Sequence, residues 1–326
     1  MQYRFFGKTG FKTSEIGLGC WQIGGDWGDV SEKTAEEILE SALENGVNFF
    51  DTADVYGGGR SETIIGNFFK KHQSDVFIAS KVGRDGSLYP DRYTEAGVRK
   101  CIEASLQRLS LERLDLIQLH CIPFEIMEDG EVFEWLRKFR REGLIKDFGA
   151  SVESMDEAIL CMEQDELCSL QIIFNIFRQK PTEKVLQKAD EKKVGIIVRL
   201  PLASGLLTGK LSRNSTFASN DHRHYNRDGK FFNVGETFAG LPFIKGVELS
   251  RKLQEMVPGG MTLTEMAIRW ILDFRAVSVI IPGASRPEQV RQNAAISDLL
   301  PLNVELHHQL TNFYEKEVKV HIRGPY

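Results

Sequence analysis

The sequence of 326 residues has no apolar stretch approaching the roughly 18 residues that a membrane-spanning helix needs. Its first residues, Met1 to Lys8, lack the apolar core of a secretory signal. Basic residues are fewer than acidic ones, 41 against 46, and the formal charge of −5 argues against a surface built for nucleic acid. We therefore expect a cytoplasmic protein with neither a membrane nor a nucleic acid as partner.

Cysteine is also scarce. The five cysteines are odd in number and form no C-x-x-C pair, which favours free thiols in a reducing compartment over a disulfide framework.

Hydrophobic residues make up 42% and charged residues 27%, and a chain of this length can bury a large core without a covalent or metal staple. The length alone allows one large domain or two ordinary ones.

Short apolar runs alternate with stretches of helical spacing along the chain. In residues 34–43, for example, Ala35, Ile38, Leu39 and Ala42 recur at the i, i+3, i+4, i+7 positions of one helix face. Residues 98–109, 132–139 and 155–162 show a similar pattern. The eight apolar runs are 16–19, 47–50, 76–79, 114–119, 148–150, 170–174, 195–199 and 277–281.

Eight strands alternating with helices predict parallel pairing and a (β/α)8 TIM barrel, here as a single domain over residues 1–326. The remaining residues fit an N-terminal β-hairpin (3–6 and 12–15), a long connection after the seventh strand, and an extra C-terminal helix over 304–317. A doubly wound open sheet is the alternative. The first strand, however, is not followed by the Gly-x-Gly-x-x-Gly turn typical of that fold.

Polar side chains stand at the ends of three successive strands, where the chemistry of such a barrel belongs. Asp51 follows the second strand with Tyr56 in the loop beyond, Lys81 ends the third strand, and His120 ends the fourth. Each residue alone has a structural explanation, as a helix cap, a rim aromatic, a solvated lysine or a satisfied histidine. Four such groups around one barrel mouth favour a catalytic site.

The chemistry that suits this set is proton transfer to a carbonyl oxygen. Tyr56 would be the proton donor, and a neighbouring Lys81 ammonium would lower its pKa. Asp51 would hold the lysine, and an uncharged His120 would orient the carbonyl and stabilise the developing alkoxide. Because none of these groups can transfer a hydride, a cofactor must supply it.

Segments spread over nearly the whole chain resemble the aldo-keto reductase family in order and spacing. They are Gly17–Trp21, Phe50–Gly57, Ala79–Lys81, Asp115–His120, Gly149–Ser151, Gln171–Asn175, Pro201–Lys210 and Ile281–Ser285 with Asn293. The resemblance implies a barrel that binds NADP(H) across its mouth and reduces small or sugar-like aldehydes and ketones. It also implies that the catalytic set is Asp51, Tyr56, Lys81 and His120, with Tyr56 as the general acid.

The same resemblance implies cofactor contacts along the mouth. Trp21 and Asp51 would lie near the nicotinamide, with Ser151 and Gln171 on its carboxamide. The pyrophosphate would lie against Pro201, Leu202, Ala203, Gly205 and Lys210. The adenosine end would be read by Gly283, Ser285, Arg286, Gln289 and Asn293.

The chain departs from the family pattern at two of these positions. Arg199 stands where many members have an aromatic residue stacked on the nicotinamide; a guanidinium plane can also stack, so Arg199 is retained as a cofactor contact. Gln289 stands where some members have arginine, which leaves Arg286 as the partner of a 2′-phosphate. NADPH is therefore favoured, with NADH as the alternative.

Other readings of the sequence stay open. Residues 210–230 carry five basic side chains and little helix or strand signal, and we expect this loop to close over the pyrophosphate. Two roles are open for Trp27, Ile122, Phe124, Phe231 and Phe232, which are apolar lining of the substrate side or packing within the fold. We expect no metal site, since the best candidate, His222-Arg-His224, lies in a loop.

An NADP(H)-binding sensor or regulatory partner of another protein is the alternative function, and the oligomeric state stays open.

Overall fold

The computed structural model describes residues 1–25, 27–28, 30–72 and 74–326. Its main sheet is a ring of eight parallel strands, each paired with the next along the chain. The strands are β3 (Leu18–Gly19), β4 (Phe49–Asp51), β5 (Phe77–Val82), β6 (Leu114–His120), β7 (Ile145–Ser151), β8 (Ser169–Ile173), β9 (Gly195–Arg199) and β10 (Val277–Ile280). Parallel bridges from Ile16 to Ile280 and from Gly19 to Gly283 join the last strand to the first and close the barrel. The predicted (β/α)8 fold is confirmed.

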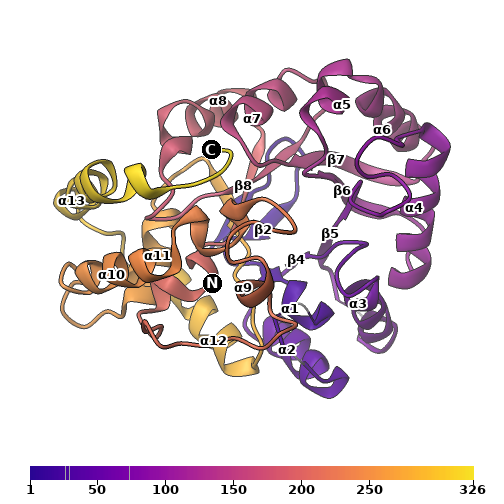
Figure 1. Ribbon diagram of the computed structural model, residues 1–326. Helices are drawn as coiled ribbons and strands as arrows, with labels where there is room; N and C mark the ends of the chain where they lie inside the picture. The colour runs from indigo at the N-terminus through magenta and orange to yellow at the C-terminus, as the bar shows by residue number, and fades with distance from the viewer. Residues whose placement is uncertain (26, 29, 73) are drawn as a thin grey trace.

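Helices surround the barrel because each strand is followed by an amphipathic stretch that packs its apolar side on the sheet (Figure 1). In α2 (Glu32–Glu44) the buried side chains include Ala35, Ile38 and Leu39, as the spacing predicted. Side-chain caps fix several starts, such as the Ser154–Glu157 capping box of α7 (Met155–Met162). The other surrounding helices are α3 (Arg60–Lys71), α4 (Glu95–Leu109), α6 (Glu131–Arg141), α8 (Val185–Lys192), α11 (Leu263–Leu272) and α12 (Pro287–Ala295).

The antiparallel hairpin of β1 (Tyr3–Phe5) and β2 (Lys12–Ser14) closes the amino ends of the strands. Phe6, which follows β1, is fully buried and packs on Phe49 and Phe77, the first residues of β4 and β5. This aromatic group plugs one end of the barrel, so the opposite end, at the carboxyl ends of the strands, is the open one.

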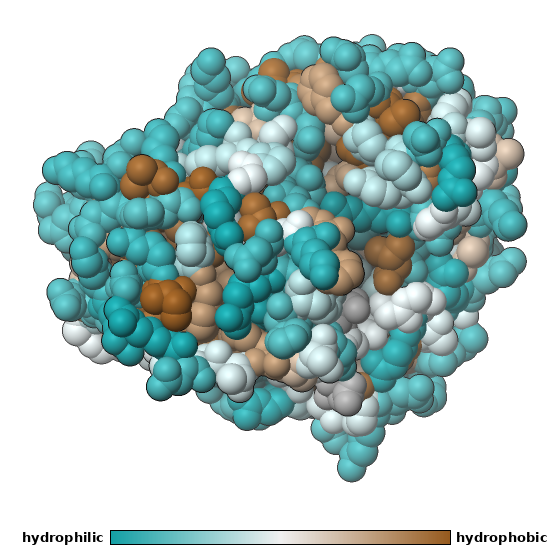
Figure 2. All heavy atoms as spheres, in the orientation of Figure 1, coloured by the Kyte–Doolittle hydropathy of each residue, from teal (hydrophilic) through white to brown (hydrophobic). Residues whose placement is uncertain are grey.

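The open end is covered in part by the long connection of residues 200–242 between β9 and α10 (Phe243–Gln254). The connection contains the short helix α9 (His222–Tyr225), which is drawn across the centre of the ring in Figure 1, and the 3-10 turn η3 (Val234–Glu236). Two more short helices, α1 (Trp21–Gly24) and α5 (Phe124–Asp129), follow β3 and β6, and α13 (Val304–Phe313) is the predicted C-terminal helix. On the face shown in Figure 2, hydrophilic side chains predominate and apolar ones form small separate groups.

The strands β4 to β7 extend beyond the carboxyl ends of the apolar runs that predicted them. Asp51 and His120 are the last residues of β4 and β6, and Lys81 lies within β5. Polar side chains did not end the strands because the backbone ladder continues past them, as in the pairing of Lys81 with Gln118. Among the described residues, no helix combines the length and apolarity needed to cross a membrane.

Candidate active site

A cavity of about 920 Å³ opens at the carboxyl ends of the strands, where a barrel of this kind carries its chemistry. Asp51, Tyr56 and His120 line it. Lys81 is fully buried and contacts both Asp51 and Tyr56. The structure therefore brings together all four residues that the sequence predicted as the catalytic set.

Lys81 links Asp51 and Tyr56 through hydrogen bonds from its ammonium group. Its Nζ atom donates to Asp51 Oδ1 at 2.5 Å, to the Thr52 carbonyl at 2.8 Å and to the Tyr56 hydroxyl at 3.1 Å. Burial alone would lower the pKa of Lys81, but the Asp51 carboxylate and the Tyr56 oxygen raise it above its usual value. Lys81 is therefore a fixed cation, and all three protons of its ammonium have acceptors.

Asp51 is held by donors on its other oxygen as well. Its Oδ2 atom accepts from the side-chain amides of Gln171 at 2.6 Å and Gln118 at 3.1 Å. Gln118 and Gln171 come from β6 and β8, so the carboxylate is fixed from three strands. A carboxylate held in this way orients the lysine and has little freedom to act as a base itself.

The ring of Tyr56 lies between two other rings. Trp21 stacks on it at 5.7 Å between centroids, and His120 meets it edge-on at 5.8 Å. Because an ammonium can only donate, the Tyr56 oxygen accepts from Lys81, and its own proton is available to a group in the cavity. The site thus presents a phenol as a hydrogen-bond donor.

The expected direction of the Tyr56 pKa is wrong. Burial raises the pKa of Tyr56 to about 12, and the Lys81 ammonium opposes this only in part. The sequence indicated the lysine correctly but gave no measure of how deeply the phenol is buried. Tyr56 is therefore protonated at neutral pH, which is the form that a proton donor requires.

His120 is held in its uncharged form, as expected. Burial, together with the nearby cations Arg84, Lys81 and Arg199, keeps the pKa of His120 well below its usual value. Its Nδ1 atom is buried and has no hydrogen-bond partner among the described residues. A neutral imidazole at this place can donate or accept a hydrogen bond without adding charge.

One side of the cavity is rich in cations. Lys210 and Arg223, in the connection after β9, and Arg286, just before α12, all line it. The guanidinium of Arg286 makes no hydrogen bond or ion pair with the rest of the described chain. It lies at the N-terminus of a nine-residue helix, where an anion is favoured. This side suits a ligand that carries phosphates.

Most residues expected to contact a cofactor lie on the cavity wall. These are Trp21, Asp51, Ser151, Gln171, Arg199, Pro201, Leu202, Gly205, Lys210, Gly283, Ser285, Arg286 and Gln289. Ala203 and Asn293 are buried and are not among the described residues that line the cavity. Ala203 belongs to the hydrophobic core and Asn293 to the buried side of α12, so both support the wall instead of forming it.

Two of these residues are already engaged with the protein. The Gln289 carbonyl oxygen accepts from the backbone N–H of Ser285 at 2.8 Å and from that of Arg286 at 3.2 Å, which fixes the turn before α12. The Gln171 amide donates to Asp51, as described above, and its oxygen lies 3.5 Å from the Ser151 hydroxyl. Both glutamines therefore position neighbouring groups in addition to facing the cavity.

Arg199 ends β9 and is fixed by three neighbours. Its Nη1 atom lies 2.6 Å from a carboxylate oxygen of Glu236, and its Nη2 atom donates to the Val152 carbonyl at 2.8 Å. Nη2 also lies 3.7 Å from Cys121 Sγ. The guanidinium is thus part of a polar network and is not a freely rotating replacement for an aromatic ring.

The basic segment 210–230 differs from the expected structureless loop. It contains α9, and Arg223 in that helix is paired with Asp221 at 2.6 Å. Arg213 pairs with Glu248, and neither Arg213 nor Arg227 is among the described residues that line the cavity. Only part of the predicted positive charge therefore faces a bound ligand.

Of the five residues considered as apolar lining, three aromatic ones lie on the cavity wall and two do not. Trp27, Phe231 and Phe232 line the cavity. Ile122 is buried in the core and Phe124 begins α5, and neither is found on the described part of the wall.

Sequence reasoning missed three charged residues of the wall: Arg84, Glu153 and Glu236. Arg84 and Glu153 lie two residues beyond the ends of β5 and β7. A search that included the next few residues after each predicted strand would have identified Arg84 and Glu153. No sequence signal places Glu236, because its position depends on the path of the 200–242 connection.

The fold and this constellation define a barrel oxidoreductase. The model of the Aldo/keto reductase family matches residues 15–315, and the chain belongs to that family.

Two relatives from Bacillus subtilis are similar over most of their length. The aldo-keto reductase YhdN is 31% identical over 91% of this chain and 89% of its own. The uncharacterized oxidoreductase YqkF is 30% identical over 94% of each. A probable voltage-gated potassium channel subunit beta of Arabidopsis thaliana is also 30% identical, over 93% of each chain.

Solved structures agree with the fold. The glycerol dehydrogenase AKR11B4 from Gluconobacter oxydans has a TM-score of 0.78 and 28% identity, covering 97% of this chain and 96% of its own. An aldo-keto reductase from Klebsiella pneumoniae in complex with NADPH has a TM-score of 0.70 and 21% identity, with 96% of each chain covered.

Asp54 lies in the same loop as Tyr56 and is unusually placed for a carboxylate. It is buried, and neither of its oxygens makes a hydrogen bond of good geometry within the described chain. Burial and the Glu62 carboxylate raise the pKa of Asp54 to about 7. Arg108, the nearby cation, pairs with Glu62 at 2.7 Å.

We expect the Asp54→Asn variant to be more stable than the wild type at pH 8. Since the folded-state pKa of Asp54 is raised, the folded chain binds the extra proton between about pH 4 and pH 7, and its stability falls as the pH rises through that range. The amide has no such penalty, so its advantage should disappear at pH 5. Urea unfolding at the two pH values measures this, with the exposed Asp129→Asn as control. A variant less stable than the wild type at pH 8 would show that the carboxylate is stabilised in the fold.

Proposed function

We propose that the protein reduces aldehydes or ketones to alcohols with NADP(H), with Tyr56 as the general acid. The observation that carries the proposal is the Lys81 ammonium, which joins Asp51 to the Tyr56 hydroxyl beneath the cavity. This arrangement leaves the phenol proton directed to a ligand. Membership of the aldo/keto reductase family supports the same reaction.

The cavity residues fit a dinucleotide phosphate. The phosphates would be bound by Lys210, Arg223 and Arg286. The N-terminus of α12, which lies beside Arg286, also favours an anion. The volume of about 920 Å³ is at the upper end of the range for small-molecule sites. The structurally similar aldo-keto reductase from Klebsiella pneumoniae, which was solved in complex with NADPH, supports this choice. When bound, the reduced nicotinamide supplies the hydride.

The protein's own residues orient the carbonyl group and donate the proton. The carbonyl oxygen of the substrate accepts hydrogen bonds from the Tyr56 hydroxyl and from neutral His120, which orient it and stabilise the charge that develops on it. Hydride addition to the carbonyl carbon leaves an alkoxide, a stronger base than a phenolate. The Tyr56 proton therefore moves to that oxygen, and the Lys81 ammonium stabilises the phenolate that remains.

A second function is favoured by one comparison. The relative from Arabidopsis thaliana is named a probable potassium channel subunit, and its similarity extends over nearly the whole chain. A regulatory subunit that binds NADP(H) with little turnover is therefore the alternative. The rate at which bound NADPH is oxidised by a reactive aldehyde separates the two functions.

Replacing Tyr56 with phenylalanine should lower the rate of carbonyl reduction by about 10²–10⁴-fold, because general acid catalysis is lost while the ring remains. Steady-state rates with a reactive aldehyde measure the loss, and fluorescence titration should show an unchanged affinity for NADPH. Tyr89, another tyrosine of the cavity wall, provides the control variant Tyr89→Phe, which should keep its activity. Near-wild-type turnover in Tyr56→Phe contradicts the assignment.

Arg286→Ala should weaken binding of NADPH by about 1.5–3 kcal/mol, the range for a hydrogen bond to a charged group, and leave NADH nearly unaffected. Titration of both cofactors with the wild type and the variant measures the difference. Arg291 on the same helix is paired with Glu288 and serves as the matched control, Arg291→Ala. Equal losses for both cofactors would mean that Arg286 supports the turn and does not bind the phosphate.

A further inference from the structure

The proposed reduction leaves one part of the cavity wall unexplained. Arg84 follows β5 and Glu153 follows β7, and Arg84 Nη2 donates to Glu153 Oε1 at 2.8 Å. Only 20% of the arginine side chain and 17% of the glutamate side chain are exposed. Both line the cavity together with His120, so a charged pair faces the reactive end of the site.

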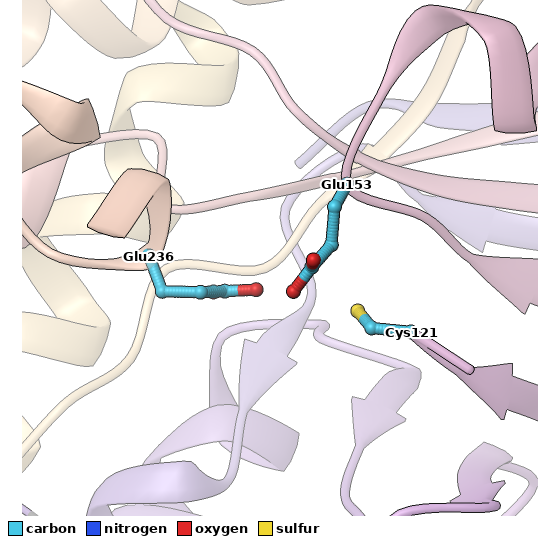
Figure 3. A group of neighbouring side chains, drawn as sticks. All are labelled: Cys121, Glu153 and Glu236. Carbon is cyan, nitrogen blue, oxygen red and sulfur yellow. The ribbon is translucent and has the colours of Figure 1, made fainter. Parts of the chain in front are cut away.

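A second pair lies next to the first. Arg199 contacts Glu236 of η3 at 2.6 Å. The carboxylate oxygens of Glu153 and Glu236 and the sulfur of Cys121 all lie within 4.8 Å of one another, and Figure 3 shows the three side chains converging from different elements. This part of the wall therefore carries two cations and two anions in two pairs, with the two anions close together.

Three converging side chains of this kind could hold a metal ion, but their partners argue against it. Each carboxylate already has a guanidinium, and Arg199 Nη2 lies 3.7 Å from the Cys121 sulfur. Burial raises the pKa of the Cys121 thiol to about 11, so that its ligating form is scarce at neutral pH. A divalent cation would have to displace two arginines, and the group is better described as paired ions.

The order of the strands places the Arg84–Glu153 pair away from the cations suited to phosphate, whereas Arg199 ends β9 and Glu236 lies in the connection that follows it. The cations suited to phosphate, Lys210, Arg223 and Arg286, follow β9 and β10. In a closed ring of eight strands, β5 and β6 lie opposite β9 and β10. A ligand whose phosphates lie at β9 and β10 would leave the wall of β5, β6 and β7 to the carbonyl compound.

We propose that the Arg84–Glu153 pair is a specificity determinant that selects neutral carbonyl compounds with hydroxyl groups on the neighbouring carbons. Among the described contacts, Arg84 uses only Nη2, so its other N–H groups are available to donate hydrogen bonds to a hydroxyl oxygen. The Glu153 carboxylate can accept a hydrogen bond from a second hydroxyl group. The inference rests on the proposed function.

Other substrate classes fit this wall less well. An apolar chain would remove water from both charged groups without replacing its hydrogen bonds, and sites built around polar groups discriminate strongly against such analogues. A carboxylate on the substrate would meet Glu153 and Glu236, whose oxygens are close together. A neutral polyhydroxylated chain offers both donors and acceptors and carries no net charge.

The test compares substrates with the same carbon skeleton. Glyceraldehyde and propanal both have three carbons, and succinic semialdehyde has a carboxylate in place of the terminal methyl group of butanal. Values of kcat/KM with NADPH, corrected for the hydrated fraction of each aldehyde, are measured for the wild type and for Arg84→Met/Glu153→Gln. The double variant removes both charges and leaves neither partner as an unpaired buried ion. Arg99→Met, which breaks a surface pair with Glu142, is the control.

We expect the ratio of glyceraldehyde to propanal to fall about 10- to 100-fold in the double variant, the effect of one hydrogen bond to a charged group. Propanal reduction should fall much less than glyceraldehyde reduction, NADPH affinity should be retained, and Arg99→Met should keep the wild-type ratio. Comparing ratios between variants removes the intrinsic difference in reactivity of the two aldehydes.

Two results overturn the inference while leaving the proposed function intact. Equal losses for glyceraldehyde and propanal would show that the pair only supports the wall. A wild-type preference for succinic semialdehyde over the uncharged aldehydes would show that the wall binds an anion. If the wild type binds NADPH but reduces none of the four aldehydes, the proposed function itself is wrong.

Discussion

The ion pair between Lys81 and Asp51 is almost completely removed from water, with side chains that are 0% and 2% exposed. Two buried charges are tolerated only when further hydrogen bonds replace the lost solvent. Here the Thr52 carbonyl and the amides of Gln118 and Gln171 do so. Since these partners come from β6, β8 and the end of β4, the pair requires the barrel to close with its strands in register. The position of Tyr56 in turn depends on the pair.

Around this centre, charge is distributed unevenly over the cavity. Lys210 and Arg286 leave a positive side at β9 and β10, whereas Arg84 and Glu153 make the opposite wall neutral by pairing. The two halves suit two different ligands: a cofactor with phosphates and an uncharged polar substrate. In the proposed reaction, both ligands would meet beside Tyr56 and His120, which line the cavity between the two sides.

The sequence predicted those features that depend on periodic pattern. Eight apolar runs gave the strands, and the polar residues at their ends gave Asp51, Lys81 and His120. What it could not predict depends on three-dimensional environment. The pKa of Tyr56 follows from burial by groups that are distant in the chain, and Glu236 reaches Arg199 only because of the path of the 200–242 connection. Gln171 was expected to face the cofactor, yet its amide also holds Asp51, a contact across the barrel that no local motif indicates.

In the proposed reduction, the Lys81 ammonium makes Tyr56 an effective proton donor. The most direct measurement is the single-turnover rate at which bound NADPH is oxidised by an aldehyde in Lys81→Met/Asp51→Asn, a variant that removes both buried charges and keeps the partners of residue 51. We expect a rate at least about 10²-fold below that of the wild type, with NADPH binding retained. A rate close to that of the wild type would contradict it, because the phenol would then act without the lysine.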